Sequence, residues 1–202
     1  GITDENGKLD YVAIKVPTVT ENTLADIVEP DGAGNTIFRT PTDIEKLAET
    51  TTGVKGWRII KYLPPNSGAW YSGNSINNTG FTYSPIGTAY DYNNEWSLPF
   101  GEFDEFCFGT FNLQYWVYCK KSAVLGTYSD AYRDIIKSSD SSTPYQAKWY
   151  NRADSGAQTD PWVSVKDHNS EVVYGENSYS AGNTSLISVD GGMAVWVRDS
   201  TK

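Results

Sequence analysis

Short apolar runs alternate with clusters of turn residues along most of the chain, and this pattern predicts strands rather than helices. Turn signals recur about every 8–12 residues, which is typical of β-sandwiches and barrels. We therefore predict a mainly β fold, an antiparallel β-sandwich or jelly roll with one short helix. The predicted strands are 57–63, 81–83, 89–92, 95–100, 103–108, 112–121, 124–128, 133–138, 145–152, 162–167, 171–174, 184–189 and 193–198.

The strongest pair of predicted strands is 103–108 and 112–121, joined by a turn at 109–111. Their sequence, FDEFCFGTFNLQYWVYCK, is apolar on both sides of the pleat. Strands that are buried on both faces show near-continuous apolar runs instead of a clean alternation. This pair is therefore predicted to form a central hairpin.

One segment, 40–51, has the signals of a helix. Thr40 can act as the N-cap, Pro41 suits the first helical position, and Asp43 completes a capping-box pattern with Thr40. Gly53 is a natural helix stop. The face expected to pack on the rest of the fold carries Ile44, Leu47 and Ala48, which are spaced i, i+3, i+4.

The first 52 residues contain fewer apolar positions than the rest of the chain. The alternating run that begins at Leu9 ends at Pro17, and turn residues from Glu29 to Gly32 end the next weak run. We interpret 1–52 as an extended lead-in that carries the helix and serves as a linker, a stalk or an oligomerisation segment. Residues 53–202 are predicted to form the β-rich recognition domain.

Composition and charge then exclude several functions. Aromatic residues make up 14% of the chain and charged residues 20%, with a net charge of −9. A negative chain with scattered Lys and Arg does not suit a nucleic-acid backbone or an anionic membrane surface. No apolar run approaches the roughly 20 residues of a membrane span. The opening, GITDENGKLD, lacks the basic and apolar regions of a signal peptide.

Two cysteines, Cys107 and Cys119, lie in the predicted central hairpin. Neither belongs to a CxxC or Cys/His metal pattern. They could face one another across the hairpin, but two free buried thiols are the favoured interpretation.

The stretch 145–176 combines large aromatics with acids and the only histidine of the chain. An apolar sugar face stacks on aromatic rings while fixed polar groups bind its hydroxyls, so this mixture is typical of a glycan site. Because side chains alternate along a strand, Trp149 and Tyr150 must point to opposite faces. Trp162 is predicted to lie in the core. The candidate ligand contacts of this stretch are Trp149, Tyr150, Asp160, Asp167 and His168.

A second aromatic candidate is the pair Trp70 and Tyr71, between SGA and SGN. Bulky rings at a loop tip need a cover in water. The pair is therefore either a stacking platform for a ligand or part of a loop that folds back on the body of the domain.

Catalytic and metal signals are weak. Asp167 could orient His168, but no GxSxG elbow or Cys-His pattern supplies a nucleophile. A glycosidase needs two carboxylates across a cleft, and calcium could lie among Asp154, Asp160 and Asp167, although no EF-hand loop is present. Glu102, Asp104 and Glu105 cluster before the central hairpin, and most of the candidate acids are expected to be solvated turn residues. We predict no enzyme activity, no metal and no cofactor.

Five segments carry a resemblance to known proteins: NEWSLPFGEFDEFCFGT, SSTPYQAKWYNR, DPWVSVKDH, EVVYGENSY and GGMAVWVRDS. Their style and order resemble the carboxy-terminal domains of virion surface proteins of tailed bacteriophages and of large DNA viruses of aquatic hosts. The resemblance covers about 150 residues. It implies a tail-fibre or adhesin head on an oligomeric, often trimeric, stalk, and it implies no catalytic residue.

A weaker likeness is to bacterial C-type-lectin-like domains, which implies an α+β fold as the alternative. It depends on Arg39–Thr42 as a helix start and on the closing glycine-plus-strand Gly192–Arg198. The chain lacks the disulfides and the calcium motif of the animal lectins.

From the sequence we expect a non-enzymatic receptor-binding domain on the virion surface that recognises a host surface glycan. Its expected partners are the host glycan or receptor and other virion proteins, in a homotrimer, with no nucleic acid and no membrane insertion. The alternatives are a structural virion or assembly protein without a ligand, a bacterial lectin-like adhesin, and a polysaccharide hydrolase. The expected contacts are Trp70, Tyr71, Trp149, Tyr150, Asp160, Asp167 and His168.

Overall fold

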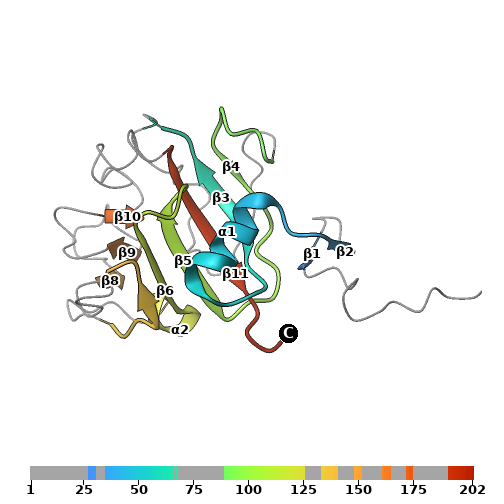
Figure 1. Ribbon diagram of the computed structural model, residues 1–202. Coiled ribbons are helices and arrows are strands. Elements are labelled where there is room, and N and C mark those ends of the chain that lie inside the picture. Colours follow the sequence, from blue (N-terminus) through green and yellow to red (C-terminus); the bar gives the residue numbers. More distant parts are fainter. Residues whose placement is uncertain are drawn as a thin grey trace, which may run out of the picture.

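Antiparallel sheets dominate the fold, which is known from a computed structural model (Figure 1). The structure describes residues 27–30, 35–65, 67, 89–125, 133–140, 148–151, 161–164, 172–174 and 191–202. The main sheet has six strands in the order β4-β3-β11-β5-β6-β7, and each neighbouring pair is antiparallel. Its strands are β3 (Arg58–Leu63), β4 (Trp96–Ser97), β5 (Glu105–Thr110), β6 (Trp116–Lys120), β7 (Lys137–Ser138) and β11 (Met193–Arg198).

Two smaller antiparallel sheets accompany the main sheet. One has the order β10-β9-β8, and the other is the hairpin β1-β2, which projects to one side in Figure 1. Their bounds are β1 (Ile27–Pro30), β2 (Thr36–Arg39), β8 (Lys148–Asn151), β9 (Pro161–Ser164) and β10 (Val172–Tyr174). The helices among the described residues are α1 (Asp43–Thr52) and the one-turn α2 (Lys121–Val124). The predicted fold class, mainly β with antiparallel strands and a short helix, is confirmed.

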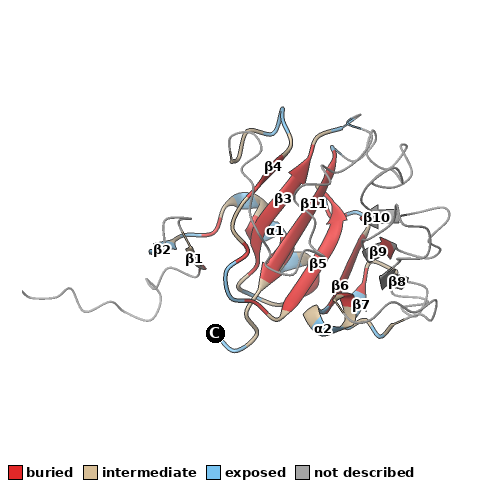
Figure 2. Cartoon of the chain, turned by 180° about the vertical axis from the view of Figure 1, so that it is seen from behind, coloured by how far each residue is buried: buried red, intermediate tan, exposed pale blue. Residues whose placement is uncertain are grey.

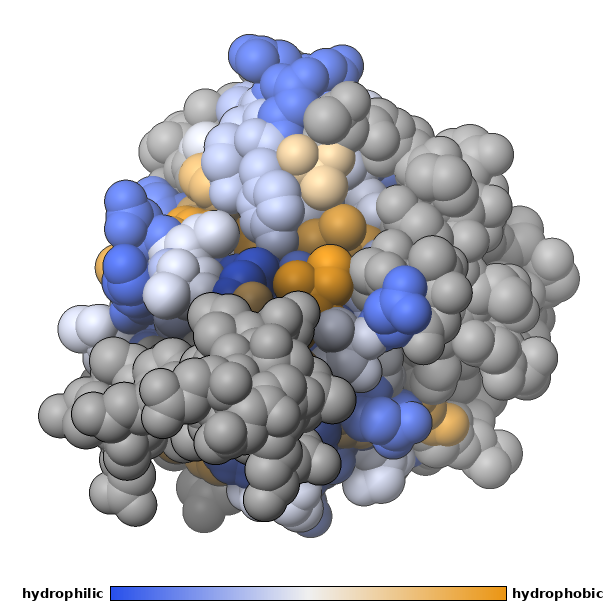
Figure 3. Space-filling view, turned by 90° about the vertical axis from the view of Figure 1, so that its right-hand side faces the viewer, coloured by the Kyte–Doolittle hydropathy of each residue, from blue (hydrophilic) through white to orange (hydrophobic). Residues whose placement is uncertain are grey.

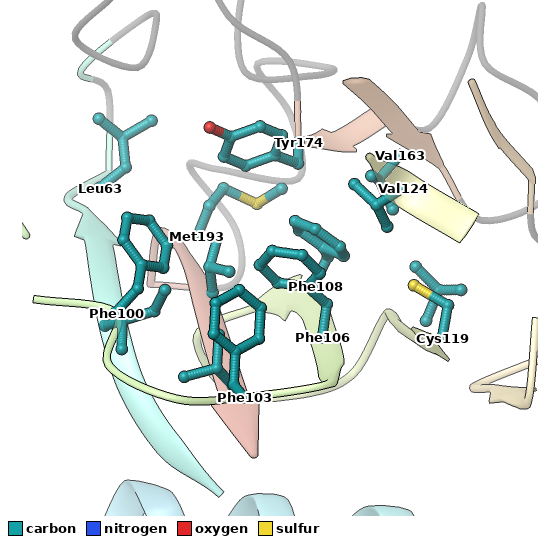
Figure 4. Close-up of a cluster of buried hydrophobic side chains, with 14 residues drawn as sticks. Leu63, Phe100, Phe103, Phe106, Phe108, Cys119, Val124, Val163, Tyr174 and Met193 are labelled. Atoms are coloured by element: carbon teal, nitrogen blue, oxygen red, sulfur yellow. The ribbon is translucent and has the colours of Figure 1, made fainter. Parts of the chain in front are cut away.

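The main sheet is buried on both faces (Figure 2). In β11, side chains alternate between two separate hydrophobic clusters: Met193, Val195 and Val197 face one cluster, while Ala194 and Trp196 face the other. The first cluster is rich in phenylalanine and includes Val163 of β9 and Tyr174 of β10 (Figure 4). The three-stranded sheet therefore contributes to the core on this face.

The opposite face of the main sheet carries a cluster rich in tryptophan, which α1 covers through Ala48. Trp57, Trp96 and Trp196 are fully buried there. Fully burying a large side chain stabilises a fold by about 1.5–3 kcal/mol. Helix α1 belongs by sequence to the proposed lead-in, yet it packs on the sheet of the following residues.

The helix begins two residues later than the sequence pattern suggested. Thr42, and not Thr40, is the N-cap, and its backbone N–H donates to the Glu45 carboxylate at 2.8 Å. The pattern Thr42-x-x-Glu45 is thus the working capping box, because Glu reaches back to the cap more readily than Asp. The predicted end is confirmed: Gly53 adopts a left-handed conformation, and its N–H donates to the Glu49 carbonyl.

The central hairpin β5-β6 is confirmed, but its turn differs from the prediction. Strand β5 continues to Thr110 and β6 begins only at Trp116. The Asn112 side chain accepts hydrogen bonds from the Thr110 hydroxyl at 2.8 Å and from the Gln114 N–H at 2.9 Å. Residues 112–115, which were predicted to begin the second strand, therefore belong to a turn that side-chain hydrogen bonds stabilise. Beyond β6 the chain enters α2, where a further strand was expected from Val124.

Both cysteines are free and buried, as the favoured interpretation held. Cys107 is paired in the ladder with Tyr118, and Cys119 is paired with Phe106. The two thiols lie in the two different clusters, on opposite faces of the sheet, so they cannot form a disulfide.

A bulge in β3 places a lysine in the core. The register between β11 and β3 shifts between Val195 and Trp196, which pair with Lys61 and Ile59 and so skip Ile60. Lys61 is consequently directed to the same side as Ile60, and its ammonium lies 5.7 Å from the centre of the Tyr174 ring. A buried ammonium over an aromatic face is a cation–π arrangement.

No helix in the part of the chain that the structure describes has both the length and the apolar character needed to cross a membrane.

Candidate recognition groove

The structure brings together a set of residues that differs from the one the sequence singled out. Trp149 and Tyr150 lie on β8, where they pair with Val163 and Trp162 of β9. The remaining candidates lie outside the described residues: Trp70, Tyr71, Asp160, Asp167 and His168. The assignment of these contacts stays a prediction.

An apolar groove opens between α1 and the segment that precedes β4. Its volume is about 540 Å³. Figure 3 shows hydrophobic side chains gathered in a hollow on this face of the molecule. The lining residues are Thr42, Asp43, Ile44, Leu47, Tyr90, Tyr92 and Phe111. We call this site the α1 groove. Small-molecule sites usually measure roughly 300–1,000 Å³ and are lined mainly by apolar and aromatic side chains.

The aromatic wall of the α1 groove is held from below by Tyr62 of β3. The Tyr62 ring packs against Tyr92 and Phe111 with centroids 5.0 and 4.8 Å apart, and the rings of Tyr92 and Phe111 are themselves 4.8 Å apart. The Tyr62 hydroxyl donates to the Gly191 carbonyl at 3.0 Å. Edge-to-face packing fixes ring orientations, so this wall is formed before any ligand arrives.

Tyr90 adds a backbone feature to the same wall. Its φ is +65°, a left-handed conformation that is rare for a bulky residue. Its ring packs on the buried Trp96 at a centroid distance of 5.3 Å, and the Arg39 guanidinium lies 5.8 Å from its centre. Such outliers persist only where the surroundings impose them, and they gather at functional sites.

The second wall is the first half of α1. Leu47 is 39% exposed and lies beside Ile44, whereas Glu45 and Ala48 are fully buried. The amphipathic pattern had placed Leu47 on the face that packs on the sheet. The helix is in fact rotated, so that Glu45, Ala48 and Thr52 face the sheet. Leu47 is left at the groove.

Glu45 can be buried because donors surround its carboxylate. It accepts hydrogen bonds from Arg39 at 2.7 Å through both oxygens, and from the Ile59 backbone N–H of β3 at 2.9 Å. Arg39 also binds Glu29 of β1 at 2.9 and 3.1 Å. Burial lowers the pKa of Arg39, but the hydrogen bonds to Glu45 and Glu29 outweigh it and hold that pKa above its ordinary value. This Glu29–Arg39–Glu45 network joins the hairpin β1-β2, α1 and β3, and lies behind Tyr90.

A second ionic network lies at the far end of the same sheet face. Glu105 is almost fully buried and accepts hydrogen bonds from the Tyr118 hydroxyl at 2.6 Å, from Arg198 at 2.5 Å and from Lys120. Burial and then the bond to Glu105 raise the pKa of Tyr118. Glu105 is therefore an exception to the expectation that most of these acids are solvated turn residues. Its partners come from β6 and β11, and the sequence alone does not show that these strands lie beside Glu105.

Two further hollows, each of about 460 Å³, flank α2 and share Lys120 and Ser122. Lys120 is engaged by Glu105 and by Asp104, the latter at 3.3 Å. Arg133 donates to the Ala123 carbonyl at 3.0 Å. These cations are used within the fold, which makes the α1 groove the better candidate. Among the described residues, no cluster of His, Cys, Asp and Glu could hold a metal ion.

Sequence reasoning missed the α1 groove because its parts come from three separate segments. Leu47 was assigned to the packed face, and Tyr90 and Tyr92 to a short strand. Ile44, assigned to the same face as Leu47, does pack partly against the tryptophan-rich cluster. One signal could have pointed to the site: Tyr90-Asp91-Tyr92 is followed by two asparagines. In the structure both asparagine side chains bind the Asp91 carboxylate, which makes this segment a turn.

Comparison with known protein families, with curated protein sequences and with solved structures finds no match to this chain.

Proposed function

We propose that the chain is a non-enzymatic recognition domain of a virion surface protein, of the tail-fibre type, that binds a host surface glycan in the α1 groove. The observation that carries this proposal is the preformed wall of Tyr90, Tyr92 and Phe111 opposite Ile44 and Leu47. A sugar ring has one apolar face, which stacks on such a wall, while its hydroxyls face the groove mouth.

The energetics of one groove favour multivalent binding. Each good ring contact contributes about 0.5–1.5 kcal/mol beyond the area that it buries. A single site of this kind binds weakly, and several copies on one particle raise the overall avidity. The proposed trimer and virion-surface location would both supply the several copies that such avidity requires. Trp70, Tyr71, Trp149, Tyr150, Asp160, Asp167 and His168 remain proposed contacts of the same ligand.

A glycan array with the full chain tests the proposal. We expect the unchanged protein to bind a subset of surface glycans and the Leu47→Asp variant to lose at least tenfold in affinity, because a carboxylate then lies in an apolar wall. Ile136→Asp is the matched control, since Ile136 is similarly exposed but lies outside the groove. A double variant, Trp70→Ala with Tyr71→Ala, compares the loop candidate with the groove.

The proposal fails in two ways. If no glycan binds the unchanged chain, the domain is not a glycan-recognition module. If Leu47→Asp binds as tightly as the Ile136→Asp control, the α1 groove is not the site, and the loop variant then decides whether Trp70 and Tyr71 take its place.

One observation favours a second function, that of a structural or assembly subunit. Phe38 is 69% exposed on β2, and its neighbour Ile37 is 40% exposed. Large apolar side chains that are exposed together on a projecting hairpin mark a surface suited to a protein partner. We expect the full chain to form oligomers whose mass falls when Phe38 is changed to Ser. A chain that stays monomeric at all concentrations would argue against this function.

A further inference from the structure

Exposed apolar side chains are concentrated at two places on the molecule. Of the five large hydrophobic residues that are exposed in the part of the chain that the structure describes, four belong to the hairpin β1-β2 or to the α1 groove. Ile37 and Phe38 lie on the hairpin, while Leu47 and Tyr92 line the groove. Apolar surface that gathers in this way marks a contact with another molecule. The chain thus carries both a projecting aromatic side chain and a hollow with an aromatic wall.

These two features do not meet within one copy, because Phe38 points away from the body of the domain. Arg39, the next residue of β2, binds Glu45 of α1 at 2.7 Å, and its ladder partner Ile27 is buried. These contacts define the face of the hairpin that is turned toward the domain. Side chains alternate along a strand, so Phe38 lies on the opposite face, in agreement with its exposure. Contact between Phe38 and an α1 groove therefore requires a second copy.

Charge does not oppose contact between the two surfaces. The chain has a net charge of −9, so copies repel one another in general. At the groove edge, however, the Asp43 carboxylate lies 3.6 Å from the Lys46 ammonium. On the described part of the hairpin, Glu29 is paired with Arg39 at 2.9 Å. Each apolar surface is therefore bordered by an ion pair and not by an isolated charge, which limits the repulsion at this contact.

The size of the two surfaces indicates a weak and reversible contact. Full burial of an aromatic side chain removes roughly 150–250 Å² from water, so the four partly exposed side chains offer roughly 300–450 Å² between them on the same scale. Stable protein interfaces bury about 1,200–2,000 Å² in total. A contact of this size forms at high protein concentration and leaves the groove open at low concentration.

We infer that Phe38 of one copy docks in the α1 groove of a second copy, so that the chains associate head to tail. This inference rests on the assembly function proposed above and names its partner. A head-to-tail contact joins two different surfaces, and it closes into a ring when the rotation between copies allows it. A docked Phe38 also occupies the place proposed for a glycan, so assembly and glycan binding compete for the same groove.

A mixing experiment with two variants of the full chain tests this inference. Phe38→Ser removes the docking side chain, and Leu47→Asp places a charge in the apolar wall. Each variant alone should stay monomeric at concentrations at which the average mass of the unchanged chain has doubled. An equimolar mixture should form dimers and nothing larger, because each pair of chains contains one intact hairpin and one intact groove. Sedimentation velocity measures these masses.

Ile136→Asp is the matched control for both variants, since Ile136 is exposed but lies outside the hairpin and the groove. It should associate like the unchanged chain. Phe38 and Leu47 are themselves exposed, so their replacement should leave the fold intact, and circular dichroism of each variant checks this.

Glycan binding supplies a second readout. At a concentration at which half of the grooves hold a neighbouring copy, Phe38→Ser should bind the tightest-binding glycan of the array about twofold more tightly than the unchanged chain. The reason is that only half of the grooves of the unchanged chain are then available. At concentrations too low for association, the two affinities should agree.

The outcomes distinguish this inference from the proposed functions. If the equimolar mixture stays monomeric, or if Leu47→Asp associates like the unchanged chain, Phe38 does not dock in the groove, and glycan recognition is left standing. An unchanged chain that is monomeric at all concentrations overturns both this inference and the assembly function. Equal glycan affinities at half occupation overturn the competition. A dimer in the mixture together with a negative glycan array supports the head-to-tail contact and removes the glycan function.

Discussion

A single buried carboxylate, Glu45, joins three elements of the fold. It accepts hydrogen bonds from Arg39 of β2, from its own N-cap Thr42 and from the Ile59 N–H of β3. A buried charge is tolerated only when it is paired and hydrogen-bonded. Removing one partner leaves a buried negative charge without a hydrogen-bond donor. Glu45 therefore connects the hairpin β1-β2 to α1, which forms one wall of the groove.

Replacing Arg39 with Met should therefore destabilise the domain by about 3 kcal/mol, which is the low end for breaking a buried pair. Lys46→Met is the matched control, because Lys46 forms an ion pair with the solvent-exposed Asp43, at 3.6 Å. Its effect should be small. Urea unfolding of both variants measures the difference. Equal stabilities for the two variants would show that the Arg39 network has no stabilising role.

Tyr62 gives the groove wall a pH dependence. Burial raises the pKa of Tyr62 to about 12, with the neighbouring Tyr92 acting in the same direction. A group with a raised native-state pKa contributes stability that is complete below its unfolded value, near 10, and is lost as the pH rises toward 12. We expect the unfolding free energy to decline between pH 10 and 12.

The variant Tyr62→Phe isolates this contribution. It loses the hydrogen bond to the Gly191 carbonyl, so its stability at pH 8 should be about 1 kcal/mol lower. Its further decline between pH 10 and 12 should be smaller than that of the unchanged protein. The measurement is urea unfolding at a series of pH values. Parallel pH profiles for the two proteins would contradict the assignment.

At the scale of elements, the turn that enters β11 sets the base of the groove. Gly192 has φ +105°, and a Cβ there would overlap the carbonyl oxygen of Leu63. The Gly192 carbonyl accepts a hydrogen bond from the Phe111 N–H at 2.9 Å. This close approach brings β3, β11 and the groove wall together, and only glycine fits it.

Two glycine substitutions separate strain from crowding. Gly56 also has a positive φ, +88°, but a Cβ there meets no atom within 4 Å. Gly56→Ala should cost about 1–2 kcal/mol for the left-handed backbone alone. Gly192→Ala should cost at least about 1 kcal/mol more because of the overlap. Thermal unfolding of both variants checks this order, and equal losses would contradict the close contact.

The positions of strands and of the helix were more predictable from the sequence than the contacts between them. The strands β3, β5, β6 and β11 and the helix end at Gly53 follow from local patterns of apolar residues and turn residues. The rotation of α1 does not, because it depends on Arg39 and Ile59 donating to Glu45. The buried Glu105 could not be predicted for the same reason, since its partners lie on other strands.

At the scale of the whole molecule, the last strand determines the architecture. Strand β11 lies between β3 and β5 and is paired with both. The local pattern MAVWVR predicts a buried strand but cannot give its neighbours, because strand order depends on long-range pairing. The groove depends on the same long-range pairing: Tyr62 of β3 packs on Phe111, which follows β5, and β11 lies between these two strands.

The central claim is that the α1 groove is the recognition site. Its most direct test is a methyl NMR titration of the full chain with the tightest-binding sugar from the glycan array. The account predicts saturable shifts of the Ile44 and Leu47 methyl signals, with one dissociation constant, and an unmoved Ile136 signal. Saturable binding that leaves Ile44 and Leu47 unmoved would contradict it.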